Sequence, residues 1–183
     1  MMSEREVHGL VLNGGGSVRM GSPKSELQIQ GISLKQHMCS LLQQSGVKRV
    51  WLSGEDIEDI YSEQGPLAGI HAALSMNASV DWLVTPVDMP LLSPNLLKQL
   101  IAQGRSAQLP CYANQCWLPI YIPSSAQHIE IATHCLNSVQ HRHWSMKHWL
   151  ANQKSLSIDV PDRMQLNNAN TPDEWQQCLS AYR

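Results

Sequence analysis

The chain has 183 residues, of which 43% are hydrophobic and 15% are charged, and its formal net charge at pH 7 is −2. This length predicts one domain, residues 1–183, whose core is large enough to be stable without cross-links. The small net charge gives no electrostatic reason to expect binding to nucleic acid or to an anionic membrane surface. No apolar run approaches the roughly 18 residues of a membrane span, and the polar start lacks the pattern of a secretion signal. The five cysteines are scattered, without a Cys-x-x-Cys pair, so we expect a cytoplasmic protein with free thiols.

Strand-like and helical segments alternate along the chain. Apolar runs predict strands over residues 7–12, 47–53, 82–87, 107–113, 117–122 and 155–160. Helical spacing and capping signals predict helices over 33–45, 66–76, 93–101, 126–139 and 146–152, and a last helix that begins at the capping box Thr171-Pro172-Asp173-Glu174. This alternation predicts an α/β fold, a three-layer α/β/α sandwich around a mainly parallel twisted sheet. Ligands of such sheets bind beyond the carboxyl ends of the strands, where we expect the loops after Leu12, Ser53 and Val87 to meet.

A glycine-rich loop, residues 12–24, follows the first strand. Its three consecutive glycines, Gly14 to Gly16, let the backbone approach a ligand and turn its amides toward an anion. Arg19 and Lys24 add positive charges that suit a triphosphate. Lys24 comes two residues too late for a Walker A loop, and the third glycine of a dinucleotide fingerprint is missing. We interpret the segment as a phosphate-binding loop, with a flexible turn that carries incidental cations as the alternative.

Three further segments carry candidate site residues. Asp88 follows a buried strand, where a carboxylate can hold Mg²⁺ or simply accept hydrogen bonds from loop amides. The small residues of 65–69 open a helix and suit either ligand contact or tight packing against the sheet. Asn168 and Asn170 precede the last helix, and the capping box does not explain them. They could equally well serve a turn.

Together the four segments resemble the molybdenum-cofactor guanylyltransferase (MobA-like) family of nucleotidyltransferases. The similarity spans nearly the whole chain in the same order. The segments that carry it are Leu12-Asn13-Gly14-Gly15-Gly16-Ser17-Val18-Arg19-Met20-Gly21 followed by Lys24, then Gly65-Pro66-Leu67-Ala68-Gly69, Pro86-Val87-Asp88-Met89-Pro90, and Asn168-Ala169-Asn170-Thr171-Pro172.

The resemblance implies a Rossmann-like nucleotidyltransferase of the nucleotide-diphospho-sugar transferase type. It implies Mg²⁺-dependent transfer of GMP from GTP to the terminal phosphate of molybdopterin, with release of pyrophosphate and handover of the product to molybdoenzymes or their chaperones. Catalysis would then depend on Arg19, Lys24 and Asp88, of which Asp88 holds the metal. Asn168 and Asn170 would face the metal or the acceptor. The nucleotide would contact Leu12, Asn13, Gly14, Gly15, Gly16, Ser17, Lys24, Asp59, Gly65, Pro66 and Leu67.

Two departures from the family pattern leave other functions open. Asn13 stands where the family has alanine, and the stretch between Trp51 and Gly65 is too short for the family's additional strand. The acidic residues 55–59 are typical of a solvated helix face. A relative that uses CTP or another acceptor, and a nucleotide-binding regulator without turnover, are therefore alternatives. A zinc-binding protein is a third alternative, with the candidate ligands His134, Cys135, His141, His143 and His148. Their spacing matches no four-ligand pattern, so histidines on a polar helix and loop are the simpler interpretation.

Overall fold

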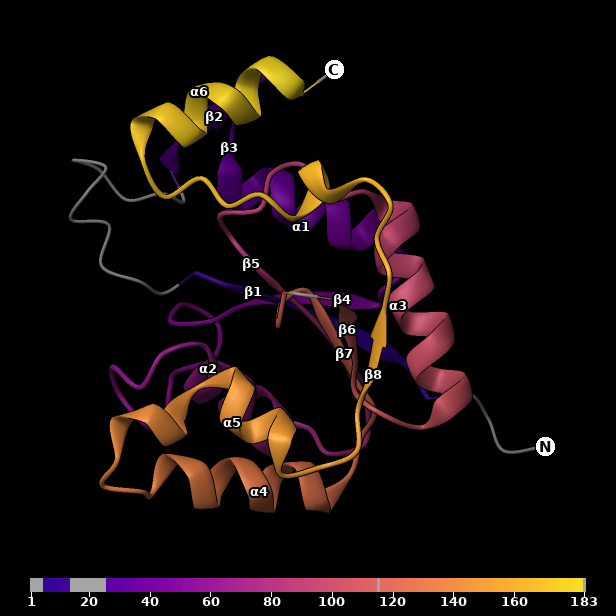
Figure 1. The fold of residues 1–183 in the computed structure, drawn as a ribbon, viewed down its shortest axis with the longest axis vertical. Coiled ribbons are helices and arrows are strands. Elements are labelled where there is room, and N and C mark those ends of the chain that lie inside the picture. Colours follow the sequence, from indigo (N-terminus) through magenta and orange to yellow (C-terminus); the bar gives the residue numbers. More distant parts are fainter. Residues whose placement is uncertain (1–4, 14–25, 115, 183) are drawn as a thin grey trace.

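A computed structural model describes residues 5–13, 26–114 and 116–182 (Figure 1). Its main sheet has six strands in the order β4-β1-β5-β7-β6-β8. Every neighbouring pair is parallel except those that involve β7, which runs antiparallel to both β5 and β6. The predicted mainly parallel sheet is therefore confirmed. The strands are β1 (Val7–Leu12), β4 (Arg49–Leu52), β5 (Asp81–Pro86), β6 (Cys111–Ala113), β7 (Ile120–Ile122) and β8 (Leu156–Ile158).

The central strands are buried on both faces, as parallel strands under two helical layers must be. All six residues of β1 are buried. Because side chains alternate across a strand, Val7 and Val11 enter one hydrophobic core and Leu10 and Leu12 enter the other. The sheet thus separates two cores, one on each face.

In the part of the chain that the structure describes, six α-helices cover the two faces of the sheet (Figure 1). On one face lie α1 (Leu34–Gln44), α3 (Pro94–Ala107) and α6 (Pro172–Ala181), and on the other lie α2 (Pro66–Met76), α4 (Ala126–Leu136) and α5 (Met146–Ala151). This is the predicted three-layer sandwich. Thr171 and Glu174 form the predicted capping box at the start of α6. Within the described ranges, no helix is long and apolar enough to cross a membrane.

Four predicted boundaries are wrong by three residues or more, among them the start of the strand predicted over 117–122, which begins only at Ile120. The helix predicted over 93–101 continues to Ala107, so the next strand begins only at Cys111. Gln108 ends this helix in the left-handed conformation, with φ 54°. The helix predicted over 126–139 already ends at Leu136.

Other small elements were not predicted. A two-stranded hairpin joins β2 (Gln28–Ile29) to β3 (Ile32–Ser33). Its turn residues Gln30 and Gly31 both have positive φ, as a tight hairpin of this length requires. Two short 3₁₀ helices, η2 (His141–Trp144) and η3 (Arg163–Leu166), complete the described elements.

Candidate nucleotide and metal site

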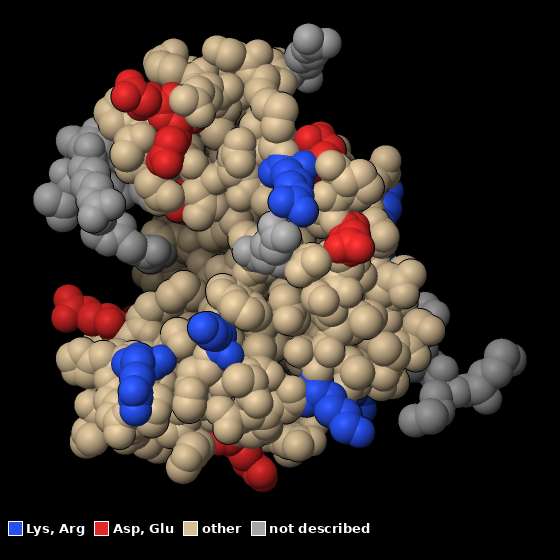
Figure 2. Space-filling model, viewed as in Figure 1, with Lys and Arg blue, Asp and Glu red and all other residues tan. Residues whose placement is uncertain are grey.

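The carboxyl ends of three parallel strands meet at one edge of the sheet. Val11 of β1 pairs with Leu52 of β4, and Leu12 pairs with Pro86 of β5. The segments that follow these strands begin at Asn13, Ser53 and Val87 and therefore share this edge, as the sequence predicts. Figure 2 shows this side of the molecule hollowed between the part that carries α6 and the part that carries α2 and α5.

The Asp88 loop, residues 87–90, is fixed by the burial of the residues on either side of Asp88. Val87 is 6% exposed and Met89 is 2% exposed, whereas Asp88 is half-buried. The Val87 amide donates a hydrogen bond of 3.1 Å to the carbonyl of Leu12. The Asp88 side chain thus belongs to a loop that is anchored at the end of the neighbouring strand.

The segment that contains Asn168 and Asn170 lies directly against the Asp88 loop. The buried residue between them, Ala169, donates its amide to the carbonyl of Asp88 at 2.8 Å. The Glu174 carboxylate accepts from the amides of Asn170 and Thr171 at 2.8 and 3.0 Å. The fold therefore brings Asp88 close to a segment that lies far from it in the sequence and carries exposed Asn168 and half-buried Asn170.

On the other side of the edge, α2 packs very closely against the strand ends. A Cβ atom on Gly69 would lie 2.8 Å from Ser53 Oγ, 2.9 Å from Leu12 Cδ2 and 3.5 Å from Asp59 Oδ1. Any other residue at this position would force the side chains of Ser53 and Leu12 to shift. Tight packing, one of the two interpretations of the small-residue segment, therefore explains Gly69.

Asp59 lies in the same tight contact. Its Oδ1 accepts a hydrogen bond of 3.3 Å from Ser53 Oγ. Burial raises the pKa of the Asp59 carboxyl, and the Ser53 hydroxyl offsets part of this shift. The family resemblance implies a nucleotide contact for Asp59 but not for Ser53, which the sequence indicates only as the end of a strand.

The start of α2 presents main chain rather than side chains. Gly65 has φ 72° and ψ −163°, which favour glycine, and both Gly65 and Pro66 are exposed. The side chain of Leu67 is fully buried in the core, so only its main chain can contact a nucleotide. No side chain within the described residues caps this helix.

The acidic residues after β4 form a turn, so the predicted helix face is wrong. Gly54 has φ 80° and donates to the carbonyl of Ile57 at 2.8 Å. The Asp56 carboxylate accepts from the Leu52 amide at 2.9 Å, a local bond that competes with helix formation. Ser53 and Ile57 form an isolated bridge there.

Asn13 is held by an ion pair that the sequence did not reveal. Its Nδ2 donates to Glu55 Oε1 at 2.7 Å, and Lys35 Nζ donates to the same carboxylate at 2.8 and 2.9 Å. The hydrogen bond from Lys35 to Glu55 raises the pKa of Lys35, although slight burial opposes the shift. The departure from the family's alanine thus places an amide within reach of an acidic turn.

Six predicted site residues lie outside the described residues, and their placement stays a prediction: Gly14, Gly15, Gly16, Ser17, Arg19 and Lys24.

Asp88 suits Mg²⁺, whereas three histidines of the segment 134–148 pack against other rings. Among the described residues, no three His, Cys, Asp or Glu side chains form a group that could hold a metal. Mg²⁺ needs no such group, because it takes one or two carboxylates together with phosphate oxygens and water. The rings of His143 and His148 instead stack on each other at 4.1 Å, and His141 stacks on Trp144 at 4.2 Å.

Two cavities lie at different distances from the edge where the strands end. One, of about 520 Å³, is lined by the β6–β7 turn and the segment after β8, including Cys116 and Arg163. Burial raises the pKa of the Cys116 thiol, and the negative charge of nearby Asp88 adds to the shift. This cavity therefore adjoins the Asp88 loop.

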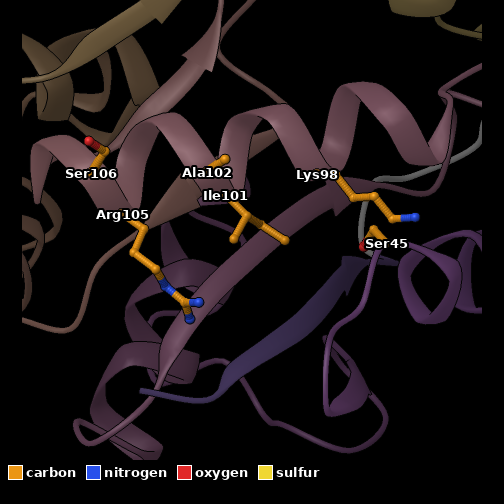
Figure 3. Close-up of a pocket in the computed structure, with 6 residues that line it drawn as sticks. All are labelled: Ser45, Lys98, Ile101, Ala102, Arg105 and Ser106. Carbon is orange, nitrogen blue, oxygen red and sulfur yellow. The ribbon is translucent and has the colours of Figure 1, made fainter. Parts of the chain in front are cut away.

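The other cavity, of about 460 Å³, lies along α3 and includes Lys98 and Arg105 (Figure 3). Arg105 reaches Asp81 at the beginning of β5, at 3.8 Å. This end of the cavity thus lies near the opposite edge of the sheet.

A mainly parallel sheet with an acidic loop at its strand ends is combined here with sequence similarity to nucleotidyltransferases, and the protein belongs to that class. A family model described as the MobA-like NTP transferase domain matches residues 9–153. The molybdenum cofactor guanylyltransferase of Xanthomonas euvesicatoria is 33% identical over an alignment of 191 positions, gaps included, which covers 98% of this chain and 97% of that protein. The chain therefore belongs to the MobA-like NTP transferase family.

Two further comparisons agree with this assignment. A molybdenum cofactor biosynthesis bifunctional protein of Synechocystis is 32% identical over 127 residues, 62% of this chain and 36% of that protein. The crystal structure of molybdopterin-guanine dinucleotide biosynthesis protein A from Archaeoglobus fulgidus superposes with a TM-score of 0.78 at 21% identity, over 95% of this chain and 97% of that one. This second likeness supports the fold.

Proposed function

We propose that this chain, as one domain, transfers GMP from GTP to the terminal phosphate of molybdopterin. The observation that carries the proposal is the hydrogen bond from Ala169 to the Asp88 carbonyl, which joins the proposed metal ligand to the asparagine segment at the strand ends. Full-length similarity to a molybdenum cofactor guanylyltransferase supports this choice of substrates. We further propose that the reaction takes place in the cytoplasm and that the product passes to molybdoenzymes or their chaperones.

The reaction needs no protein nucleophile. A phosphate oxygen of molybdopterin, already anionic, forms a bond to the α-phosphorus of GTP, and the bond from that phosphorus to the bridging oxygen breaks to release pyrophosphate. The chain's task is to align the two phosphates and neutralise their charge. Mg²⁺, when bound, would supply charge neutralisation and orientation of the phosphate oxygens.

The proposed roles of the residues follow from their place at the strand ends, either beside the Asp88 loop or beside the start of α2. Asp88 would hold Mg²⁺, with Asn168 and Asn170 toward the metal or the acceptor. Arg19, Lys24 and the amides of the glycine loop would bind the leaving pyrophosphate. The remaining contacts to base and ribose would come from residues 12–17, Asp59 and the exposed main chain of residues 65–67.

The cavity of about 520 Å³ beside the Asp88 loop is the proposed acceptor site. Arg163 lines it and supplies a positive charge for an anionic acceptor, while the Asp159 carboxylate, also in the lining, accepts a hydrogen bond of 2.9 Å from Asn114. Asn114 and Cys116 line it from the β6–β7 turn. This assignment places the attacking phosphate on the Asp88 side, opposite the start of α2.

The decisive experiment measures pyrophosphate release from GTP and from CTP, with Mg²⁺ and molybdopterin, for the wild type and Asp88→Ala. We expect release from GTP, and a loss of about a hundredfold or more in the variant, the size of a lost electrostatic group at a transition state. Asp173→Ala, an exposed carboxylate in the first turn of α6, is the matched control and should keep wild-type turnover.

The outcomes separate the alternatives. Release from CTP alone would favour the cytidylyltransferase alternative, and thermal stabilisation by GTP without release would favour the regulator. Unchanged release in Asp88→Ala would contradict only the metal assignment.

A further inference from the structure

His37, a residue without a role so far, lies beneath the Asp88 loop. It belongs to the first half of α1 and is 7% exposed. Its Nε2 lies 2.9 Å from the carbonyl oxygen of Pro90, and its Nδ1 lies 3.5 Å from the hydroxyl of Tyr182. The rings of His37 and Tyr182 also meet edge to face, with centroids 5.3 Å apart. One buried imidazole thus contacts both the Asp88 loop and the residue that follows α6.

The chemistry of the two partners fixes where the ring carries its proton. A carbonyl oxygen can only accept, so Nε2 of His37 must be the protonated nitrogen that donates to Pro90. In the neutral ring, Nδ1 is then an acceptor, and the Tyr182 hydroxyl must donate to it. The contact to Pro90 is the short, well-formed one of the two, since 3.5 Å is long for a hydrogen bond.

These contacts close a ring of interactions around the site. The Asp88 loop is held by Leu12 at Val87, by Ala169 at Asp88 and by His37 at Pro90. Ala169 leads into α6, whose Trp175 and Cys178 pack into the core under α1, and α6 ends beside Tyr182. The segment before α6 therefore contacts the Asp88 loop through Ala169, and the residue after α6 contacts the same loop through His37.

We propose that His37 is a positioning residue that fixes the Asp88 loop against the C-terminal segment, so that Asp88 and the two asparagines act on the same phosphate. The proposal rests on the proposed function for its effect on turnover. The structural part of it does not, because the contacts to Pro90 and Tyr182 exist without substrate.

The experiment compares His37→Leu, which removes the donor, with His37→Gln, whose side-chain amide can still donate to Pro90. Amide hydrogen exchange over residues 87–92 and at Ala169 reports the loop directly, and the Mg²⁺ concentration for half-maximal pyrophosphate release reports its function. For His37→Leu we expect about tenfold faster exchange and about a tenfold higher Mg²⁺ requirement, the size of one lost hydrogen bond. GTP binding without Mg²⁺ should not change, and His37→Gln should recover most of both losses.

His128→Leu is the matched control, because His128 is 6% exposed but lies on the opposite face of the sheet. It should leave the exchange of residues 87–92 unchanged. The proposal is overturned if folded His37→Leu keeps wild-type exchange there, or if His37→Gln is no better than His37→Leu. If the wild type releases no pyrophosphate with any acceptor, the proposed function fails, and the exchange data still decide whether His37 holds the loop.

Discussion

The two halves of the site are built by different means. The metal half, residues 87–90 with 168–170, is held by hydrogen bonds to its main-chain carbonyls from Ala169 and His37. The nucleotide half, Asn13 with residues 53–59 and the start of α2, is held by close packing around Gly69 and by side-chain bonds to acidic groups. Burial of Val87 and Met89 also fixes the metal half, but the hydrogen bonds to its main-chain carbonyls do not depend on its side chains, whereas packing against a glycine depends on one residue.

The halves also differ in how far their polar atoms are satisfied. Two buried oxygens without a hydrogen-bond partner among the described residues, Asn13 Oδ1 and Gln64 Oε1, lie in or beside the nucleotide half, whereas one, Thr85 Oγ1, lies beside the metal half. Buried acceptors without partners are costly, and a ligand that donates to them removes the cost. The nucleotide half is therefore expected to change more on binding than the metal half.

The largest effect should come from filling the space at Gly69. Gly69→Val places methyl groups where a single Cβ would already lie 2.8 Å from Ser53 Oγ and 2.9 Å from Leu12 Cδ2. We expect a loss of about 2–3 kcal/mol in the free energy of unfolding, typical of overpacking, and weaker protection by GTP in thermal melts. Ser75→Val, at an exposed position of the same helix, should cost well under half as much. Because valine has a better helix propensity than glycine, a loss in Gly69→Val must come from packing or strain. Equal losses in the two variants would contradict a special role for packing against the strand ends.

A smaller effect should follow from Glu174→Ala in the metal half. The variant frees the amides of Asn170 and Thr171, and the loss of this cap should cost about 1 kcal/mol in urea unfolding. Because Ala169 still donates to Asp88, turnover should fall mainly through a higher KM for the acceptor. Glu130→Ala, an exposed carboxylate on α4, is the control. A fall in kcat with an unchanged KM would instead implicate Glu174 in the chemical step.

Much of this architecture could be predicted because it depends on short-range patterns. Both β1 and α2 have their predicted bounds, since a strand-like run that ends at a glycine-rich segment and a first-turn proline are local signals. The capping box of α6 was predicted for the same reason. The roles of Asp88 and Asp59 stay predictions: the end of a buried strand indicated Asp88, and the family resemblance implied Asp59.

What could not be predicted depends on the fold. The contact of Ala169 with Asp88 and the link from Asn13 through Glu55 to Lys35 join distant segments, and no local pattern announces them. The same is true of His37, an isolated histidine on a helix whose partners lie after β5 and after α6. The acidic turn was mistaken for a helix because the charge pattern fits both, and the positive φ of Gly54 decides between them.

The smallest effect is the pH dependence of Asp59. Burial raises the pKa of its carboxyl above the ordinary 3.8, so the folded chain binds this proton more tightly than the unfolded chain does. The resulting stabilisation is present below the ordinary pKa and is lost as the pH rises through the folded value. Asp59→Asn should therefore be more stable than the wild type near pH 7, and the gap should close as the pH falls toward 4.

Urea midpoints of the two proteins between pH 4 and pH 7.5 measure this gap. A gap that is constant or that widens at low pH would contradict the sign, since it would mean that the ionised carboxylate stabilises the nucleotide half. A closing gap means that the free protein holds an unfavourable charge beside Ser53 and Gly69. A base that donates N–H groups to this carboxylate would relieve that charge, so GTP should protect the wild type more than Asp59→Asn. Equal protection would place the base away from Asp59 and leave the packing around Gly69 as the main determinant of this half.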